Sequence, residues 1–264
     1  MSRIQAWFKG NPERKALVSF VTAGDPTVNH TVPAMHALVA GGVDLLELGI
    51  PFSDPEAEGP AIQASSERAL ANGMTLKKVL NLVSSFRERD QLTPIILMGY
   101  LNSILSMPDF ARQAQAAGVD GLIMVNLPPE SASELQAELA AHHIDLIYLI
   151  APTTTDQRAQ RILSQASGFV YYVSLKGITG SDNLRSDEVA ARLAHLRQWS
   201  DLPICVGFGI KDAATAAAVA KTADGVVVGS ALVQLLARHE SDVDAGVAAL
   251  LDEAKALRQG VDQG

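Results

Sequence analysis

Two glutamates, Glu47 and Glu58, are the residues of this sequence best placed for acid–base chemistry. Glu47 lies near the end of an apolar strand on which Val43 and Leu45 share its face, by the two-residue period of extended chain. A carboxyl group on an apolar face is costly to bury, so it must find partners or shift its pKa upward. We therefore predict an acid–base site, with Glu47 on a rigid strand and Glu58 on the loop that follows it.

The loop between the two glutamates combines stiffness with negative charge. Pro51, Pro55 and Pro60 fix φ between Gly49 and Pro60, and Gly49 and Gly59 relax the backbone near either end of this stretch. Asp54 and Glu56 add two more acids, and no Lys or Arg occurs between Glu47 and Arg68. For Asp54 and Glu56 a solvated turn is an equally good interpretation, whereas for Glu47 the functional interpretation is favoured.

The composition limits the class of protein. The chain has 264 residues and a net charge of −8, and its acids are spread along it. That balance argues against a nucleic-acid-binding or anionic-membrane surface, because both need clustered basic residues. No apolar run reaches the length of a membrane span, and the first residues lack the apolar core of a signal peptide, so we expect a cytoplasmic protein.

Cysteine and histidine do not form a recognisable metal-binding pattern. The single cysteine, Cys205, excludes an internal disulfide and any cysteine-based metal cage. It lies within an apolar strand, so we expect a buried, inert thiol. The six histidines lack metal-ligand spacing and are expected on helix surfaces, so we assign them no role. The chain also lacks a Walker lysine motif and a complete dinucleotide fingerprint, and we predict no NAD binding.

Short apolar runs alternate with amphipathic segments, which is the pattern of a parallel α/β fold. The predicted strands are Ala16–Thr22, Val43–Leu48, Pro94–Gly99, Gly121–Val125, Asp145–Ile150, Phe169–Val173, Pro203–Gly207 and Gly225–Val228. The predicted helices include Thr75–Arg89, Asp109–Ala117, Ser133–His142, Asp156–Gln165, Asp187–Arg197 and Asp212–Lys221, each capped by its first residue. A helix over Val28–Ala40 is less regular, because Pro33 lies within it.

Eight strand-and-helix units favour closure into a barrel over a doubly wound open sheet. A weak internal repeat supports the count: residues 40–46 resemble residues 116–122, each with Gly-Val-Asp within it, and 223–226 is a shorter version. No Pro/Gly/Ser-rich linker divides the chain. The sequence therefore predicts a single α/β domain over residues 1–264, a (β/α)8 TIM barrel with an extra N-terminal helix and two long loops on its catalytic face.

The two long loops both connect a strand to a helix, and in a barrel such loops rise from the catalytic face. The first runs from Gly49 to about Ala61 and carries Glu58. The second runs from Ser174 to about Asp187 and combines glycines with small polar residues. That composition suits a hinged lid over a ligand, with an ordinary surface loop as the alternative.

The last third of the chain offers a phosphate site. Gly207 and Gly209 follow the seventh strand, and Gly229 and Ser230 follow the eighth and open a helix. Glycines let backbone N–H groups approach an anion, and the start of a helix adds a favourable dipole. In barrels this pair of loops is a frequent phosphate cradle.

Taken together, the motifs of this chain resemble those of one family, the alpha subunit of tryptophan synthase, over nearly the whole length. The run from Glu47 to Pro55, Glu-Leu-Gly-Ile-Pro-Phe-Ser-Asp-Pro, is highly specific. The other motifs lie at residues 20–26, 59–63, 98–102, 177–180, 207–210 and 229–231. The glycine pairs would not be specific by themselves.

The resemblance implies retro-aldol cleavage of indole-3-glycerol phosphate to indole and glyceraldehyde 3-phosphate in tryptophan biosynthesis, without a metal or organic cofactor. It also implies a beta-subunit partner that receives the indole, in an alpha2beta2 complex. On the family's pattern Glu47 shuttles protons, and Glu58 stabilises the charge that develops at the indole N–H.

The resemblance also implies a set of substrate-binding residues. Those around the indole ring would be Phe20, Tyr100, Tyr171 and Phe208, for each of which plain core packing is the alternative. Those at the phosphate would be Gly180, Gly209, Gly229 and Ser230, with Thr179 closing against the loop acid.

The chain departs from the family's pattern at four positions. Glu58 stands where aspartate is more common, and Glu56 stands where an apolar residue is expected. Two neighbouring acids can raise each other's pKa, which would weaken an ionised Glu58. Asn126 replaces a usual aspartate and Leu175 a common arginine, and both bear on communication between subunits.

The sequence is therefore compatible with three functions: a lyase subunit working with a beta partner, a stand-alone lyase, and a catalytically silent subunit that only activates its partner. The third is motivated by the altered loop acids. A different phosphate-binding barrel enzyme, an isomerase or epimerase, would not explain the loop around Asp54. Pro51 and Pro55, with Asp54, are candidate partner contacts, because a stiff loop loses little entropy on docking.

Overall fold

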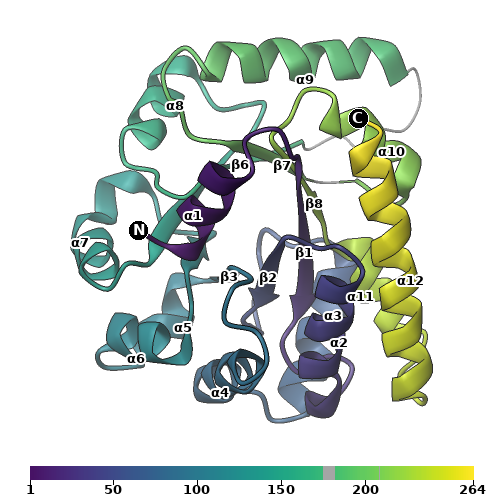
Figure 1. The fold of residues 1–264 in the computed structure, drawn as a ribbon. Helices are drawn as coiled ribbons and strands as arrows, with labels where there is room; N and C mark the ends of the chain where they lie inside the picture. Colours follow the sequence, from purple (N-terminus) through teal and green to yellow (C-terminus); the bar gives the residue numbers. More distant parts are fainter. Residues whose placement is uncertain (175–181, 208) are drawn as a thin grey trace.

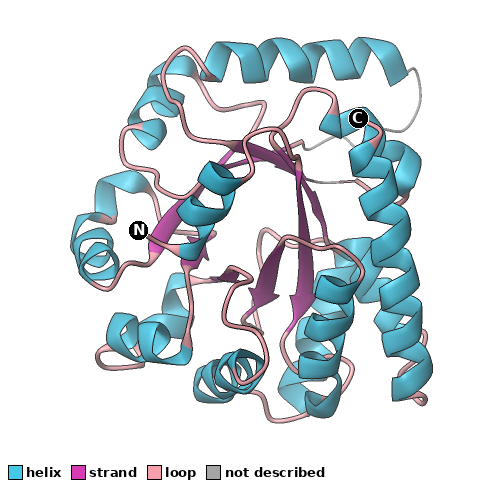
Figure 2. Ribbon diagram, in the orientation of Figure 1, coloured by secondary structure: helices cyan, strands magenta, loops and turns pink. Residues whose placement is uncertain are grey.

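Eight parallel strands close into a barrel in chain order, each hydrogen-bonded to the next and the last to the first. The structure is a computed structural model and describes residues 1–174, 182–207 and 209–264. Figure 1 and Figure 2 show the strands with helices around them. The strands are β1 (Ala16–Thr22), β2 (Leu45–Gly49), β3 (Ile95–Gly99), β4 (Gly121–Met124), β5 (Asp145–Ile150), β6 (Val170–Val173), β7 (Ile204–Gly207) and β8 (Gly225–Val228).

All eight predicted strands are present, and their bounds differ from the predicted ones by at most two residues. The closed strand order confirms the (β/α)8 barrel and rules out the doubly wound sheet. The first predicted long loop joins β2 to the helix that begins at Pro60. Residues 175–181 of the second predicted loop lie outside the described residues.

Helices cover the outside of the barrel. They are α1 (Arg3–Gly10), α2 (Val28–Ala40), α3 (Pro60–Ala71), α4 (Leu76–Arg87), α5 (Leu101–Leu105), α6 (Phe110–Ala117), α7 (Ser133–Ala141), α8 (Asp156–Leu163), α9 (Asp182–Leu196), α10 (Ala213–Ala220), α11 (Ser230–Ala237) and α12 (Val243–Asp262), with a 3-10 turn η1 (Pro129–Ser131). The last helix, α12, packs between α2 and α10 on one side of the barrel (Figure 1). Helix α2 runs unbroken through Pro33.

Two of the six predicted helix caps are confirmed. The Thr75 hydroxyl accepts the N–H of Lys78 at 3.3 Å, and Asp212 forms a capping box with Thr215. Both cap residues have the extended backbone that an N-cap needs.

The other four predicted caps are wrong, because the residues lack the position or backbone of an N-cap. Asp109 has a left-handed backbone with φ of 52° and makes no side-chain cap bond. Thr155 caps α8 in place of Asp156, Ser133 is already helical, and Asp187 lies inside α9.

The core has two layers, one inside the barrel and one between the barrel and its helices. Leu45 belongs to the inner layer, whereas Leu46 and Leu48 belong to the outer one. Glu47 must therefore point inward, because alternate residues of a strand share a face. Its register neighbours are Phe20 of β1 and Ile96 of β3.

Helix α1 closes the N-terminal end of the barrel, which confirms the extra N-terminal helix. Ile4 enters the inner core and is fully buried. Ser2 and Gln5 both donate hydrogen bonds to Asp145, the latter at 2.8 Å, and Arg3 pairs with Asp120 at 2.8 Å. Figure 1 shows α1 lying across the barrel in this view.

The internal Gly-Val-Asp repeat has a structural explanation at the same end of the barrel. Asp44, Asp120 and Asp224 each accept the backbone N–H at the start of the preceding strand in the barrel, in every case at 2.9 Å. Each also pairs with a neighbouring arginine: Arg258 at 2.7 Å, Arg87 at 2.8 Å and Arg197 at 2.9 Å. We call Asp44, Asp120 and Asp224 the strand-start aspartates.

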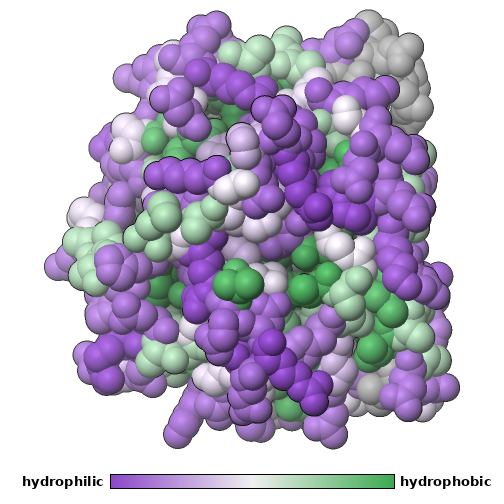
Figure 3. Space-filling view, in the orientation of Figure 1, coloured by the Kyte–Doolittle hydropathy of each residue, from purple (hydrophilic) through white to green (hydrophobic). Residues whose placement is uncertain are grey.

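The surface seen in Figure 3 is mainly hydrophilic, and its apolar side chains appear in small groups. Among the described helices, none is long and apolar enough to cross a membrane.

Candidate active site

The carboxyl group of Glu47 is buried, and one of its oxygens has no hydrogen-bond partner among the described residues. Glu47 is the central residue of β2 and is 1% exposed. Its Oε2 atom accepts no hydrogen bond from the residues that the structure describes. Burial, and secondarily the charge of Glu58, raises the pKa of Glu47 to about 8. At neutral pH the group is therefore mostly protonated, so it can give its proton and, once ionised, take one back.

Glu58 lies opposite on the loop between β2 and α3 and is half-buried. Burial raises its pKa. Glu56, two residues earlier, is exposed. Burial, and not the like charge of Glu56, is thus the cause of the raised pKa, contrary to the expectation from the sequence.

The loop is attached to β3 and its following residue. The N–H of Ile50 donates to the carbonyl of Met98 at 2.7 Å, and the N–H of Ala57 donates to the hydroxyl of Tyr100 at 3.0 Å. The rings of Phe52 and Tyr100 stack, with centroids 5.0 Å apart and planes 22° apart. These contacts bring Glu58 over the end of the barrel that carries Glu47.

A narrow pocket lies under this loop. It brings together three of the predicted site residues, Phe20, Glu58 and Tyr100. Gly49 forms part of its wall, where a Cβ atom would lie 2.6 Å from the Phe20 ring. Only glycine therefore lets the ring approach the strand so closely.

Tyr171 of β6 packs against the inner core layer of the barrel. Burial raises the pKa of its phenol well above the usual value, and the charges of Glu47 and Glu58 add to the effect. A Cβ atom at Gly207 of the neighbouring strand would lie 2.5 Å from the Tyr171 hydroxyl. Tyr171 is thus a neutral phenol in the same environment as the two glutamates.

The predicted phosphate residues lie where β7 and β8, which are neighbours, come to their ends. Gly209 has a φ of +77°, in the region that favours glycine. Gly229 is the N-cap of α11, and Ser230 is the exposed first residue of that helix. The helix start directs backbone N–H groups outward, which suits an anion. Thr179, Gly180 and Phe208 lie outside the described residues.

Sequence reasoning missed several residues of the pocket. Thr22, Ser66 and Met98 line it, and Phe52 stacks on Tyr100. Thr22 and Met98 lie within the motifs at residues 20–26 and 98–102 but were not singled out, and no sequence signal marks Ser66 on its helix face. Phe52 was visible only as part of the motif around Glu47.

Histidine and cysteine take no part in the pocket as described. Cys205 is fully buried, and burial raises the pKa of its thiol well above the usual value, which confirms the inert thiol. His30 is also fully buried, so its expected place on a helix surface is wrong. It bonds to Thr27 through Nδ1 at 2.7 Å. In the described part of the chain, no group of three or more His, Cys, Asp or Glu could hold a metal ion.

Asn126 and the partner-contact candidates lie on the same face. The side chain of Asn126 accepts the N–H of Leu101 at 2.8 Å and so ties the end of β4 to α5. Asp54 is exposed and accepts a hydrogen bond from Ser53 at 2.5 Å. Leu175 lies beyond what the structure describes.

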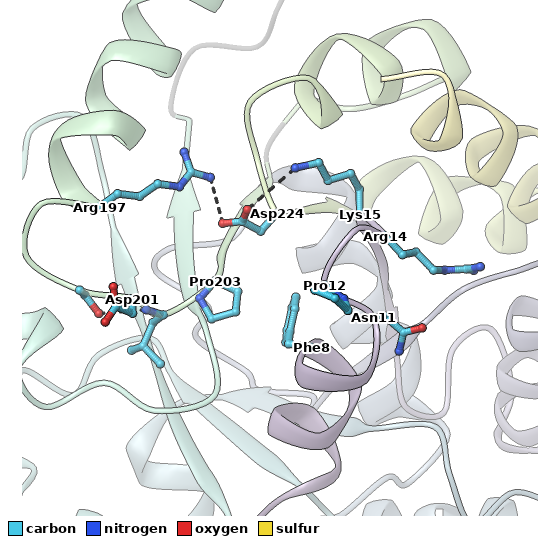
Figure 4. A pocket seen from close by; sticks show the side chains of 11 residues that line it. Phe8, Asn11, Pro12, Arg14, Lys15, Arg197, Asp201, Pro203 and Asp224 are labelled. Carbon is cyan, nitrogen blue, oxygen red and sulfur yellow. Dashed lines mark hydrogen bonds and ion pairs between the residues drawn. The ribbon is translucent and has the colours of Figure 1, made fainter.

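A wider hollow opens at the other end of the barrel. There Lys15 and Arg197 reach toward Asp224 from two sides (Figure 4). No predicted catalytic or substrate-binding residue lines it. The smaller pocket is lined by Phe20, Glu58 and Tyr100 and is therefore the candidate active site; Glu47, Tyr171, Gly209, Gly229 and Ser230 do not line it.

Comparison with known proteins agrees with this geometry. The family model described as tryptophan synthase alpha chain matches residues 8–262. The tryptophan synthase alpha chain of Marinobacter nauticus is 50% identical over 99% of this chain and 98% of its own, and that of Thioalkalivibrio sulfidiphilus is 51% identical over 99% and 100%.

Solved structures agree as well. Tryptophan synthase subunit alpha from Legionella pneumophila superimposes with a TM-score of 0.92 at 42% identity, covering 100% of both chains. A chain of aminoacrylate-bound tryptophan synthase from M. tuberculosis has a TM-score of 0.87 at 34% identity, covering 99% of this chain and 100% of that one. The chain therefore belongs to the tryptophan synthase alpha chain family, as a carbon–carbon lyase subunit that cleaves indole-3-glycerol phosphate in tryptophan biosynthesis, and membership of this family implies a beta-subunit partner.

Proposed function

We propose that Glu47 is the proton shuttle of the cleavage. The bond between indole C3 and the glycerol chain breaks when C3 gains a proton and the neighbouring hydroxyl loses one, leaving indole and the aldehyde of glyceraldehyde 3-phosphate. A neutral Glu47 gives its proton to C3, and the resulting carboxylate takes the proton of the hydroxyl. The observation that carries this proposal is the buried Oε2 atom, which has no hydrogen-bond partner among the described residues and belongs to a carboxyl group with a pKa of about 8.

Glu58 takes the second role, at the indole nitrogen. As C3 is protonated, positive charge grows at the indole N–H, and a carboxylate nearby lowers the energy of that state. Glu58 lines the pocket from the loop side, opposite the barrel wall. Only its ionised form stabilises a positive charge, so the raised pKa of Glu58 should limit activity on the acid side.

The remaining predicted residues bind the two ends of the substrate. Phe20 and Tyr100 line the pocket and Tyr171 packs nearby, so these rings suit the indole. Gly209, Gly229 and Ser230 stand at the ends of β7 and β8, where backbone N–H groups suit the phosphate. The sequence motifs add Phe208 to the indole end and Gly180 to the phosphate end, and they make Thr179 the residue that closes against Glu58.

Replacement of Glu47 by glutamine tests the proton shuttle, because glutamine keeps the shape and removes the proton transfer. Indole release by the folded variant should fall on the order of 10²- to 10⁴-fold. Glu56→Gln is the matched control, since it removes an exposed carboxyl group from the same face. Near-native turnover by Glu47→Gln would overturn the assignment.

We also propose that the chain acts in the cytoplasm within an alpha2beta2 complex, with Asp54 and Pro55 among its contacts to the beta subunit, whereas Pro51 is buried and is no longer a candidate. Asp54 is exposed on the loop that carries Glu58, so docking there would act directly on that residue. Turnover measured with and without the beta subunit separates this proposal from a stand-alone lyase and from a silent subunit. Sedimentation of the mixture tests the complex, and unchanged partner affinity in Asp54→Ala would count against that contact.

A further inference from the structure

Tyr100 touches the catalytic loop at two places. Its hydroxyl accepts the N–H of Ala57 at 3.0 Å, and its ring stacks on Phe52. Phe52 and Ala57 lie toward opposite ends of the loop, whereas Tyr100 directly follows β3 and is only 4% exposed. The buried side chain of Tyr100, which follows the neighbouring strand β3, thus contacts the loop near both of its ends.

Little else in the described structure fastens this part of the loop. The N–H of Glu58 donates to the carbonyl of Pro55 at 3.3 Å, within the loop itself. The carbonyl of Glu58 accepts a hydrogen bond from Gln63 of α3 at 2.8 Å, but α3 follows the loop directly in the chain. For residues 51 to 58, the hydrogen bond from Ala57 to Tyr100 is the only one in the described structure that links the loop to a residue following a different strand, β3.

We propose that Tyr100 is a positioning residue for Glu58. It clamps the loop at Phe52 and at Ala57, and Ala57 is bonded directly to Glu58. The inference rests on the role proposed above for Glu58. It gives the Tyr100 hydroxyl a function distinct from that of its ring, which lines the pocket.

The chemistry explains why such a clamp matters. A carboxylate that stabilises a growing charge must stand at a fixed place, and misplacement by about 1 Å can cost on the order of 10²-fold in rate. Glutamate has one more rotatable bond than aspartate, so its carboxylate depends more on a fixed backbone. Tyr100 supplies that fixed point from a rigid strand end.

Tyr100→Phe tests the clamp directly, because it keeps the ring stack and removes the hydroxyl. Hydrogen exchange over residues 51–59 should be about fivefold faster at Ala57 in this variant, as expected for loss of one ordinary hydrogen bond. Tyr148→Phe is the matched control: Tyr148 is 6% exposed and its hydroxyl has no partner among the described residues. Equal exchange at Ala57 in wild type and Tyr100→Phe would overturn the clamp.

A double-mutant cycle with Glu58→Gln tests whether the clamp acts through Glu58. Tyr100→Phe should lower kcat more than it changes KM, and it should cost little further once Glu58 is glutamine. An equal fold-loss in both backgrounds would show that Tyr100 acts on the substrate directly and would refute the positioning role. Wild-type turnover by Glu58→Gln alone would contradict the role of Glu58, whereas the exchange measurement decides the clamp independently.

Discussion

Glu47→Gln should make the protein more stable, and increasingly so as the pH rises. The folded state holds the proton of Glu47 with a pKa of about 8, against 4.5 for the ordinary group. Below pH 4.5 both folded and unfolded chains are protonated, and the group has no effect on stability. Between these two values only the folded chain keeps the proton, so the free energy of unfolding falls by about 1.4 kcal/mol for each pH unit.

The whole shift in the pKa of Glu47 corresponds to about 5 kcal/mol in the free energy of unfolding, and about 3 kcal/mol of that stability is already lost at pH 7. Glutamine does not ionise and avoids this loss. The stability difference between variant and wild type should therefore grow by about 3 to 4 kcal/mol from pH 5 to pH 8. That amount is a large part of the 5 to 15 kcal/mol, roughly, that holds an ordinary domain together.

Urea unfolding at pH 5 and at pH 8 measures the difference, with wild type, Glu47→Gln and Glu56→Gln compared side by side. Glu56→Gln should keep the pH slope of the wild type, because its carboxyl group is exposed. A constant difference between Glu47→Gln and wild type at the two pH values would refute the reasoning. It would mean that the folded protein does not hold the proton of Glu47 more tightly than the unfolded chain.

Three further changes test other parts of the site and fold. Glu58→Gln removes the charge that helps to raise the pKa of Glu47, so this pKa should fall, and carboxyl ¹³C NMR measures it; an unchanged titration would contradict the coupling. Gly49→Ala places a methyl group 2.6 Å from the Phe20 ring, so it should destabilise the protein by about 1 to 3 kcal/mol and raise KM; a wild-type KM would show that the ring position is unimportant. Asp120→Ala leaves the buried Arg87 without its carboxylate and should cost about 3 to 5 kcal/mol of stability at an unchanged kcat, as thermal unfolding and turnover can check; a lower kcat would link that end of the barrel to the site.

The parts of the fold that depend on a regular spacing of apolar residues were predictable from the sequence. The two-residue period put Glu47 and Leu45 on one face of β2, and the structure places Leu45 inside the barrel. The strands were found because both of their faces are apolar. Helix starts were harder, since Asp109 and Asp212 look alike in sequence and differ in backbone, left-handed at one and extended at the other.

The contacts that build the pocket were not predictable, because they join distant segments. Nothing near Tyr100 in sequence indicates that its hydroxyl accepts the N–H of Ala57. The burial of His30 depends likewise on the packing of α2 against the barrel. The cause of the raised pKa of Glu58 also needed the structure, because exposure of Glu56 cannot be inferred from its place in the chain.

The strand-start aspartates separate the stabilisation of the barrel from its chemistry, because the two depend on opposite ends of the strands. These aspartates bind neighbouring strands to one another at the end where the strands begin, whereas the candidate active site lies where β2 and β3 end. The circumference of the barrel is thus set without help from the loops around the pocket. Substitutions in those loops, such as glutamate for aspartate at Glu58, can accumulate over evolutionary time and retune the chemistry while the strands keep their register.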